Sequence, residues 1–362
     1  MVNHRTLTCL LLSASAVTAQ AQDPDERTGP SVSFPAVSPD GQKIVFVSDA
    51  GASKDIWIVN RDGSNVRPLI NWSGSDELAP DWSPDGKILA FASTRNGGKL
   101  NIWATDQNGA NPRQLTSGGA NNSQPRYSPD GARIAFTSDR TGKRELWIMN
   151  ADGTGQHSVG LISKKVSDPT WSPDGSEIAY VGCSAGTCNL YAITADGARS
   201  RQITFGQAND WQPHWSSWGI VFASDRDGLQ SIWVVGGTGS GIRSFTNPGP
   251  TGDMYPRWDK TGGAYFSRAG LDTESAGSNM WYTNGQGAEK RITNIQGTFM
   301  NGDANGDGKT DCADLELVKK SFGARTGQGS YDTRADLNGD GIVDLRDLTI
   351  VSKGLSSGIT CK

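Results

Sequence analysis

Histidine, charged residues and long apolar segments are scarce in this 362-residue chain, and each scarcity argues against a class of function. Beyond the first 21 residues only two histidines are present, His157 and His214. Neither stands in a zinc-binding or catalytic-triad spacing, so they give no support to a metalloenzyme or a serine hydrolase. Charged residues make up 20% of the chain and the net charge is −4, which gives no electrostatic basis for binding nucleic acid.

The most apolar run, Leu7–Val17, lies close to the N-terminus. It follows His4 and Arg5 and precedes Ala19-Gln20-Ala21, which is the pattern of a secretory signal with its cleavage site. No other run approaches the roughly 18 to 20 apolar residues that a membrane helix needs. We therefore expect residues 1–21 to be a signal peptide and residues 22–30 an N-terminal extension. The mature protein would be secreted or held at the cell surface, with the periplasm as the alternative.

Four cysteines remain once Cys9, inside the predicted signal, is set aside. In an oxidising compartment an even number predicts disulfides, and four cysteines allow three pairings. Cys183 and Cys188 bracket a short loop between two predicted strands. Their spacing is not Cys-x-x-Cys, so a bridge that clamps the loop is favoured over a redox dithiol. Cys312 and Cys361 would then form the second bridge.

Glycine, by contrast, is abundant, with 46 residues, and the chain contains an internal repeat. The second unit shows its content: a strand through Trp82, a turn at Ser83-Pro84-Asp85-Gly86, and further strands near 88–93, 101–104 and 113–116. Four short antiparallel strands per unit of this length are typical of a β-propeller blade. The start of the unit, a proline two residues before an aromatic or apolar residue, recurs at intervals of 43 to 45 residues, at Pro35, Pro80, Pro125, Pro169, Pro213 and Pro256.

Nine of the twelve tryptophans fall in two repeated positions, which indicates packing of one blade on the next. The Ser-Pro-Asp-Gly turn is altered in the fifth and sixth units, and it is intact after Ser38, Ser83, Ser128 and Ser172. The predicted fold is all-β: a monomeric six-bladed propeller of four-stranded antiparallel blades over residues 31–296. Because the first unit begins with an inner strand and the last ends with an outer one, we expect blade 1 to close on blade 6 without a shared strand.

These units resemble the TolB-like propeller repeats, also called WD40-like or PD40 repeats. In that family Pro-x-Trp-Ser-Pro-Asp-Gly precedes an Ile-Ala-Phe-x-Ser strand, and the second unit here has Pro80-Asp81-Trp82-Ser83-Pro84-Asp85-Gly86 before Ile88-Leu89-Ala90-Phe91-Ala92-Ser93. The resemblance spans about residues 31–293. It implies a propeller that binds a protein or a peptide, and nothing here matches the additional α/β domain that precedes the blades in TolB.

Polar residues precede the first strand of each unit, at positions where the repeat breaks down. In a propeller these loops gather around one mouth of the central channel, the usual place for a ligand. We expect a site for a polysaccharide or a peptide at this mouth, in which loss of Asp210 or Trp211 weakens binding without lowering stability. Its candidate residues are Glu77, Asn122, Asp168, Asp210, Trp211, Asp253 and Tyr255.

Two of these candidates, Trp211 and Tyr255, have alternative roles. They either shield blade edges or form a stacking platform for a sugar or peptide, and the shielding role is favoured because stacking needs an exposed ring face. Four arginines that follow the second strands are interpreted as turn residues: Arg95, Arg140, Arg226 and Arg268.

After residue 293 the pattern changes to two acidic loops, 33 residues apart, each followed by a single predicted helix. Each loop has side-chain oxygens at positions 1, 3, 5, 9 and 12 and a backbone carbonyl at position 7, which is the calcium loop of an EF-hand. The sequence therefore predicts two Ca²⁺ ions. The predicted ligands are Asp303, Asn305, Asp307, Lys309, Asp311 and Asp314 in the first loop, and Asp336, Asn338, Asp340, Ile342, Asp344 and Asp347 in the second.

One helix per loop, with Asp at position 12, resembles a type I dockerin, and we assign residues 297–362 to this module. The resemblance implies calcium-dependent folding and docking on a cohesin domain of a scaffold protein in polysaccharide-degrading assemblies. The family's recognition positions fall on Cys312, Ala313, Lys319, Lys320, Leu345, Arg346, Ser352 and Lys353.

These features together predict an exported, noncatalytic adaptor: a binding propeller that its dockerin tethers to a cohesin-type partner. Two alternatives stay open. The first is a polysaccharide-active hydrolase or lyase on the propeller, and the second is a periplasmic protein- or peptide-binding module of the TolB kind.

Overall fold

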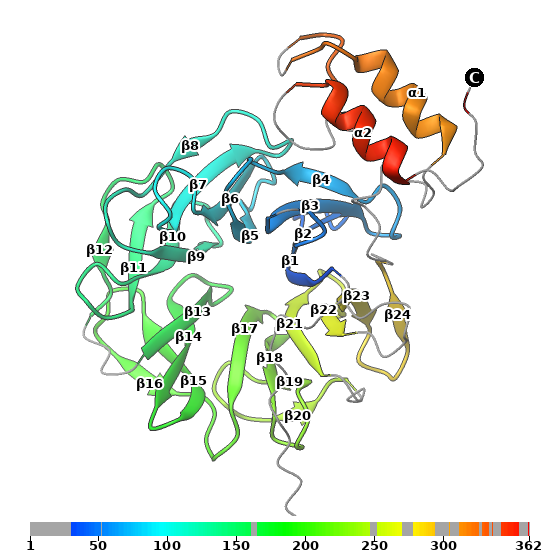
Figure 1. Ribbon diagram of the computed structural model, residues 1–362. Coiled ribbons are helices and arrows are strands. Elements are labelled where there is room, and N and C mark those ends of the chain that lie inside the picture. Colours follow the sequence, from blue (N-terminus) through cyan, green and yellow to red (C-terminus); the bar gives the residue numbers. More distant parts are fainter. Residues whose placement is uncertain are drawn as a thin grey trace, which may run out of the picture.

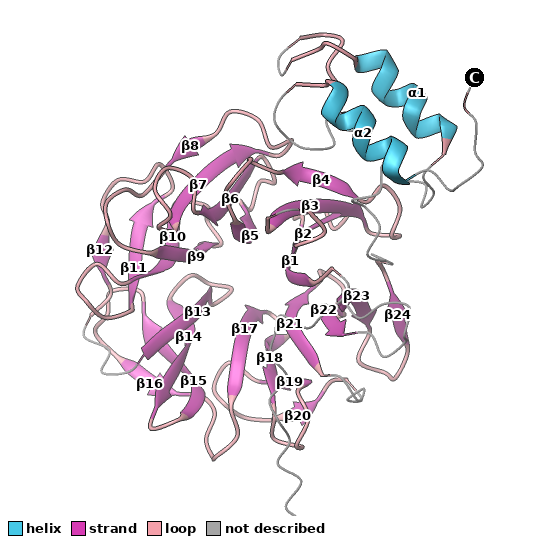
Figure 2. Ribbon diagram, viewed as in Figure 1, coloured by secondary structure: helices cyan, strands magenta, loops and turns pink. Residues whose placement is uncertain are grey.

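The computed structural model describes a chain made mostly of strands, with two helices near its C-terminus (Figures 1 and 2). The six sheets lie in a ring around a central axis, and the helices are α1 (Cys312–Ser321) and α2 (Leu345–Gly354). In the described residues neither helix is long and apolar enough to cross a membrane. The residues that the structure describes are 30–51, 53–160, 165–246, 252–269, 278–293, 304, 311–325, 328–332, 335, 342–354 and 361.

Each sheet consists of four antiparallel strands that are consecutive in the chain, which confirms the predicted six-bladed propeller. The strands of the first three blades are β1 (Val32–Val37), β2 (Lys43–Ser48), β3 (Asp55–Asn60), β4 (Arg67–Ile70), β5 (Glu77–Trp82), β6 (Ile88–Ser93), β7 (Asn101–Asp106), β8 (Arg113–Gln114), β9 (Asn122–Tyr127), β10 (Arg133–Ser138), β11 (Glu145–Asn150) and β12 (His157–Ser158). Those of the last three are β13 (Lys165–Trp171), β14 (Glu177–Ser184), β15 (Thr187–Thr194), β16 (Ser200–Gln202), β17 (Asp210–Ser216), β18 (Gly219–Ser224), β19 (Ser231–Val235), β20 (Arg243–Ser244), β21 (Asp253–Trp258), β22 (Ala264–Ala269), β23 (Ser278–Thr283) and β24 (Glu289–Arg291).

The second strand of each blade is apolar along nearly its whole length because neighbouring blades cover both of its faces. Phe91 of β6, for example, is fully buried in a cluster that joins Val45 of blade 1 to Trp82 and Trp103 of blade 2. The indole N–H of Trp82 also donates to the backbone carbonyl of Ala36 in the preceding blade, at 3.2 Å. The repeated tryptophans therefore hold adjacent blades together, as their periodicity predicts.

The Ser-Pro-Asp-Gly turn joins the first two strands through its own side chains. In the second blade the hydroxyl of Ser83 donates to Asp85 at 2.6 Å and accepts from the backbone N–H of Ile88 at 2.9 Å. Gly86 has a φ of 71°, a left-handed conformation that glycine adopts without steric cost. The sixth blade, where the turn sequence is altered, closes its turn in another way: Asp259 accepts hydrogen bonds from the backbone N–H groups of Thr261 and Gly263.

Blade 1 closes on blade 6 through side chains and single backbone contacts. The backbone N–H of Val32 donates to Oγ of Ser278 at 2.6 Å, and a buried cluster unites Val32 and Phe46 with Tyr265 and Met280. Every described sheet keeps its own four strands. Closure without a shared strand is thus confirmed for the described part of the chain.

Both predicted disulfides are present, Cys183–Cys188 with a Cα–Cα distance of 4.0 Å and Cys312–Cys361 with one of 5.4 Å. The first clamps the hairpin between β14 and β15, as expected. The second joins the first residue of α1 to the C-terminal end of the chain across 49 positions. The predicted signal peptide lies outside the described residues.

Candidate functional sites: the propeller channel and the calcium loops

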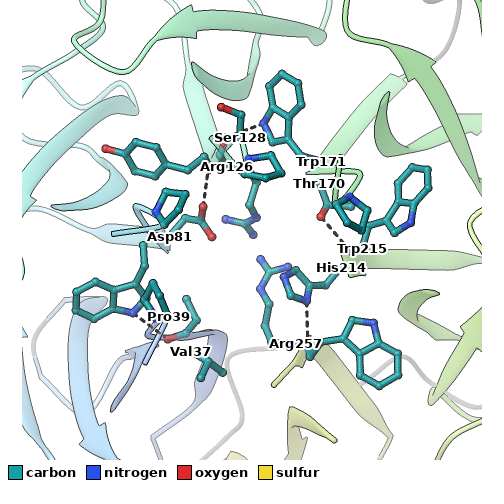
Figure 3. Close-up of a pocket in the computed structure, with 17 residues that line it drawn as sticks. Val37, Pro39, Asp81, Arg126, Ser128, Thr170, Trp171, His214, Trp215 and Arg257 are labelled. Atoms are coloured by element: carbon teal, nitrogen blue, oxygen red, sulfur yellow. Dashed lines mark hydrogen bonds between the residues drawn. The ribbon is translucent and has the colours of Figure 1, made fainter. Parts of the chain in front are cut away.

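A cavity of about 200 Å³ occupies the centre of the propeller (Figure 3). Residues of the first strand of every blade line it, together with prolines of the Ser-Pro-Asp-Gly turns. Its walls therefore come from the one strand per blade that faces the axis. The residue that follows each repeated proline contributes one member of a ring, which we call the channel ring: Ala36, Asp81, Arg126, Thr170, His214 and Arg257.

Three polar members of the channel ring bond to the neighbouring blade. Each accepts from the backbone N–H of the aromatic residue in the equivalent strand of the next blade. Asp81 accepts from Tyr127 at 2.8 Å, Thr170 from Trp215 at 3.1 Å, and Nδ1 of His214 from Trp258 at 3.0 Å. These side chains satisfy backbone donors that would otherwise be buried without a partner. His214 thus has a structural role, since it links two adjacent blades.

The two arginines of the channel ring are bonded differently. Nη1 of Arg126 donates to the carbonyl of Pro125 at 2.8 Å, and Nε of Arg257 donates to the carbonyl of Pro35 at 3.1 Å. Among the described residues, Nε of Arg126 is buried without a hydrogen-bond partner. Arg126 and Arg257 are only 5% and 7% exposed, respectively. Even so, neither guanidinium group forms an ion pair with a carboxylate within the described residues.

Burial sets the protonation of the other ring members. It raises the pKa of Asp81 to about 6, against the opposing effects of Arg126 and of the Tyr127 N–H. It also lowers the pKa of His214 to about 3, and the charge of Arg126 acts in the same direction. At neutral pH His214 is therefore neutral, consistent with its Nδ1 being an acceptor.

A second ring, formed by the residue before each repeated proline, narrows the channel. All six have positive φ values between 50° and 57°, because each first strand carries a β-bulge at this point. Gln124 donates to Asp168 at 2.7 Å, the rings of Phe34 and Tyr255 lie 4.4 Å apart, and the cavity here measures about 10 Å³. We call these residues the narrow ring: Phe34, Ala79, Gln124, Asp168, Gln212 and Tyr255.

The structure places only two of the seven predicted mouth residues, Asp168 and Tyr255, at the channel. Trp211 packs against the buried cluster between blades 4 and 5, as the edge-shielding role implies. The other four have fully buried side chains and differ from the expectation that they face the mouth: Glu77, Asn122, Asp210 and Asp253.

These four buried side chains stabilise the blades. Asp210 pairs with Arg226 at 2.7 Å, and Arg268 forms the equivalent ion pair with Asp253. The guanidinium of Arg226 also lies 4.9 Å from the centre of the Trp233 ring. Arg140, Arg226 and Arg268 therefore do more than form turns, because each bonds the first strand of its blade and lies over the tryptophan of the third.

Sequence reasoning missed Arg126 and Arg257. The signal was present, because the residue between the repeated proline and the aromatic position varies more in charge than its neighbours. This position faces the channel in every blade. Because this repeat position varies while its neighbours stay constant, it could have been predicted from the sequence to line the channel.

Only part of the calcium loops lies within the described residues. Five of the twelve predicted ligands are described: Asp311, Asp314, Ile342, Asp344 and Asp347. The other seven lie outside the described residues: Asp303, Asn305, Asp307, Lys309, Asp336, Asn338 and Asp340.

The described ends of the two loops have equivalent geometry. The carboxylate of Asp314 is fully buried and accepts from the backbone N–H of Asp311 at 2.8 Å, and Asp347 is fully buried and accepts from Asp344 at the same distance. Each position-12 carboxylate is thus turned back toward its own loop. Buried carboxylates at the start of a helix fit a hard cation that prefers oxygen ligands.

The helical module has its own small core, in which Val318 of α1 and Val351 of α2 are buried with Val343. Among the predicted docking residues, Lys319, Lys320 and Ser352 are exposed and Leu345 is 70% exposed. Lys319 donates to Glu316 at 2.9 Å. The side chains of Arg346 and Lys353 lie outside the described part of the structure.

Comparison with known families assigns both parts of the chain. The family model of the TolB beta propeller domain matches residues 25–181 and 154–293, and that of the dockerin type I domain matches residues 301–356. The propeller matches cover more than half of the chain, so it belongs to the TolB-type β-propeller family, and it carries a dockerin type I domain. Domains of the latter type generally bind calcium.

Among curated proteins, the Tol-Pal system protein TolB of Rhizorhabdus wittichii is 36% identical over 66 residues, which is 18% of this chain and 15% of that protein. The chain thus spans about 15% of the length of this relative. Among solved structures, a putative TolB from Agrobacterium tumefaciens aligns with a TM-score of 0.55 and 24% identity over 65% of this chain and 87% of that one. The β-propeller domain of the trilobed protease of Pyrococcus furiosus, described as having an open velcro topology, aligns with a TM-score of 0.53 and 16% identity over 74% and 99%. These structural likenesses concern the fold.

Proposed function

We propose that the protein is an exported, noncatalytic adaptor. Its propeller binds a ligand in the central channel, and its dockerin docks in a calcium-dependent manner on a cohesin-type domain of a scaffold protein. The observation that carries this proposal is the presence of a propeller family match and a dockerin family match in one chain. A docking module gives a binding domain a fixed place in an assembly, and two Ca²⁺ ions would hold that module folded.

The chemistry of the channel favours binding over catalysis. Asp81, Thr170 and His214 already accept backbone hydrogen bonds between blades. A glycosidase of the usual kind needs two carboxyl groups at a defined separation around the scissile bond. Of the described residues that line the wide cavity, Asp81 is the one carboxylate. The arrangement therefore supports a ligand site more than an acid-base pair.

The dockerin supports a setting in polysaccharide-degrading assemblies outside the cytoplasm, where cohesin domains carry such modules. Docking would involve the recognition positions of the dockerin, of which Lys319, Lys320, Leu345 and Ser352 are exposed. The remaining two positions are Arg346 and Lys353. In this setting the propeller would hold a component of the substrate or of the assembly close to the enzymes.

The proposal is tested with the full chain and a panel of immobilised cohesin domains. Binding is measured in calcium and again after chelation, and the same preparation is incubated with plant and bacterial polysaccharides while products are followed. We expect calcium-dependent capture by at least one cohesin and no product release. Release of oligosaccharides would show an enzyme, and failure of every cohesin to bind in calcium would contradict the adaptor role.

A further inference from the structure

We propose that the floor of the wide channel cavity binds a carboxylate held between the guanidinium groups of Arg126 and Arg257, and that this carboxylate is the C-terminus of a polypeptide. The inference rests on the proposed binding role of the channel and names the chemistry of its ligand. Figure 3 shows the two side chains extending from opposite walls with their guanidinium groups pointing toward each other.

The two facing guanidinium groups are electrostatically unfavourable without an anion between them. Two buried cations that face one another repel, and burial removes the water that would screen them. Two carboxylates lie nearby, but Asp81 accepts from the Tyr127 N–H and Asp168 accepts from Gln124, and neither forms an ion pair with these arginines among the described residues. An anion between the guanidinium groups would relieve this repulsion.

The two guanidinium groups also have hydrogen-bonding capacity for a ligand. Each guanidinium group has five N–H donors, and each of these two uses one of its nitrogens to bind a backbone carbonyl. Nε of Arg126 is buried and has no hydrogen-bond partner in the part of the chain that the structure describes, although buried polar groups are nearly always hydrogen-bonded. A planar carboxylate matches the fork of a guanidinium group and can bind it through two hydrogen bonds. The neutral His214 beside them adds no competing charge.

The channel narrows at the level of these two arginines. Arg126 and Arg257 line both the wide cavity of about 200 Å³ and the narrow one of about 10 Å³. They therefore mark the level at which the channel becomes too narrow for anything larger than about one water molecule. A chain that enters from the wide side must do so end-on. A polypeptide ends in a carboxylate, whereas an acidic polysaccharide carries its carboxylates along its length, so the geometry favours the peptide terminus.

The test uses the full, calcium-loaded chain and tryptophan fluorescence, because Trp82, Trp171, Trp215 and Trp258 line the cavity. The probes are N-acetyl tetra-alanine with a free C-terminal carboxylate, the same peptide as its C-terminal amide, sodium succinate, trigalacturonate and inorganic phosphate. We expect the free acid to bind at least about tenfold more tightly than the amide, as charge-assisted bonds predict. Succinate should compete with it.

The variants are Arg257→Gln, Arg126→Gln and Arg257→Lys, with Arg291→Gln as the control. Arg291 is exposed at the end of β24, so its replacement makes the same charge change outside the channel. Each glutamine variant of the channel should weaken binding of the acid by about tenfold or more, and lysine should restore part of it. The thermal midpoint of each variant establishes that it is folded, and Arg257→Lys keeps the test valid if a glutamine variant does not fold.

Four outcomes would overturn the inference. Equal binding of the acid and the amide would show that the site does not recognise a carboxylate. Tighter binding of phosphate would show that the preferred ligand is a phosphate. Tighter binding of trigalacturonate would show that it is a sugar acid and not a peptide C-terminus. Absence of saturable binding by every carboxylate also overturns it. If immobilised cohesin still captures the same samples in a calcium-dependent manner, the adaptor role stands although the carboxylate site does not. Failure of this inference can therefore be told apart from failure of the proposed function.

Discussion

Arg226 donates from Nη2 to Oδ1 of Asp210 at 2.7 Å and so ties the turn after β18 to the start of β17 inside blade 5. The same contact recurs between Arg140 and Asn122 in blade 3. Arg268 pairs with Asp253 in blade 6. Asp210, which the sequence assigned to ligand binding, therefore holds the strands of its blade together, and its replacement is expected to lower the stability of the propeller.

Asp210→Ala is expected to destabilise the propeller by about 2 to 4 kcal/mol, because it leaves the mostly buried Arg226 without its partner. This corrects the expectation that the substitution leaves stability unchanged. Denaturant unfolding followed by tryptophan fluorescence measures the change. Asp227→Ala, which removes an exposed carboxylate three residues after the end of β18, is the matched control. The double variant Asp210→Ala/Arg226→Met should recover part of the loss, and an Asp210→Ala variant as stable as the parent would contradict the fastening role.

The stability of the propeller is expected to fall as pH rises from about 4.5 to 7 through Glu77. Burial raises the pKa of this carboxyl from 4.5 to about 7, although Ser75 and Ser93 donate hydrogen bonds to it. The folded state therefore binds the proton more tightly than the unfolded state. Its contribution is present below pH 4.5 and is lost as pH rises through 7, with a size on the order of 3 kcal/mol at most.

The variant Glu77→Gln removes this titration. Its unfolding free energy should depend less on pH between 5 and 8 than that of the parent, and relative to the parent it should gain stability toward pH 8. Asp55, whose pKa burial also raises to about 7, provides a residual slope in both proteins. Parallel pH profiles for variant and parent would argue against a protonated Glu77 in the folded state.

Calcium removal is expected to unfold the dockerin and leave the propeller folded. The carboxylates of each loop repel one another without a cation, whereas the propeller core contains no predicted calcium ligand. All 12 tryptophans precede residue 282, so tryptophan fluorescence reports the propeller alone and far-ultraviolet circular dichroism at 222 nm reports the helices. Chelation should reduce the helical signal and spare the fluorescence midpoint. Asp347→Ala should lower calcium affinity, with Glu316→Ala as control, and loss of both signals on chelation would show that the two parts unfold together.

Cys361→Ser is expected to destabilise the dockerin by up to about 4 kcal/mol, since the Cys312–Cys361 bridge encloses 49 positions and restricts the unfolded chain. Cys188→Ser opens a much smaller loop, for which the same chain-entropy relation gives about 2 kcal/mol. Calcium titrations and chemical unfolding of the oxidised proteins measure both. The serine at 361 should raise the calcium concentration needed for folding, and an unchanged requirement would show that the bridge adds nothing to the calcium-loaded state.

Local patterns in the chain were enough to predict the blades and the tail. Each repeat unit begins with a proline, such as Pro80, and contains a turn whose residues have intrinsic preferences for turn conformations. The number of these units sets the number of blades. The spacing of Asp311 and Asp314 in the first calcium loop is likewise a local property. The Cys183–Cys188 bridge could be predicted because its two residues flank one hairpin.

The sequence alone determined the repeat, the turns, the dockerin and the two disulfides, because each depends on residues that are close in the chain or left over by elimination. Only the tertiary structure decided which polar residues face the channel. In blade 2, Leu78 pairs with Ala92 and Asp81 with Ala90, so β5 has one more residue than β6 between these two pairs. This β-bulge places the side chains of Glu77 and Asp81 on opposite faces of the strand, whereas regular alternation would place them on the same face. Glu77 is thereby buried inside the blade and Asp81 reaches the axis. The approach of Arg126 and Arg257 across that axis depends on ring closure, which brings residues 131 positions apart to one cavity.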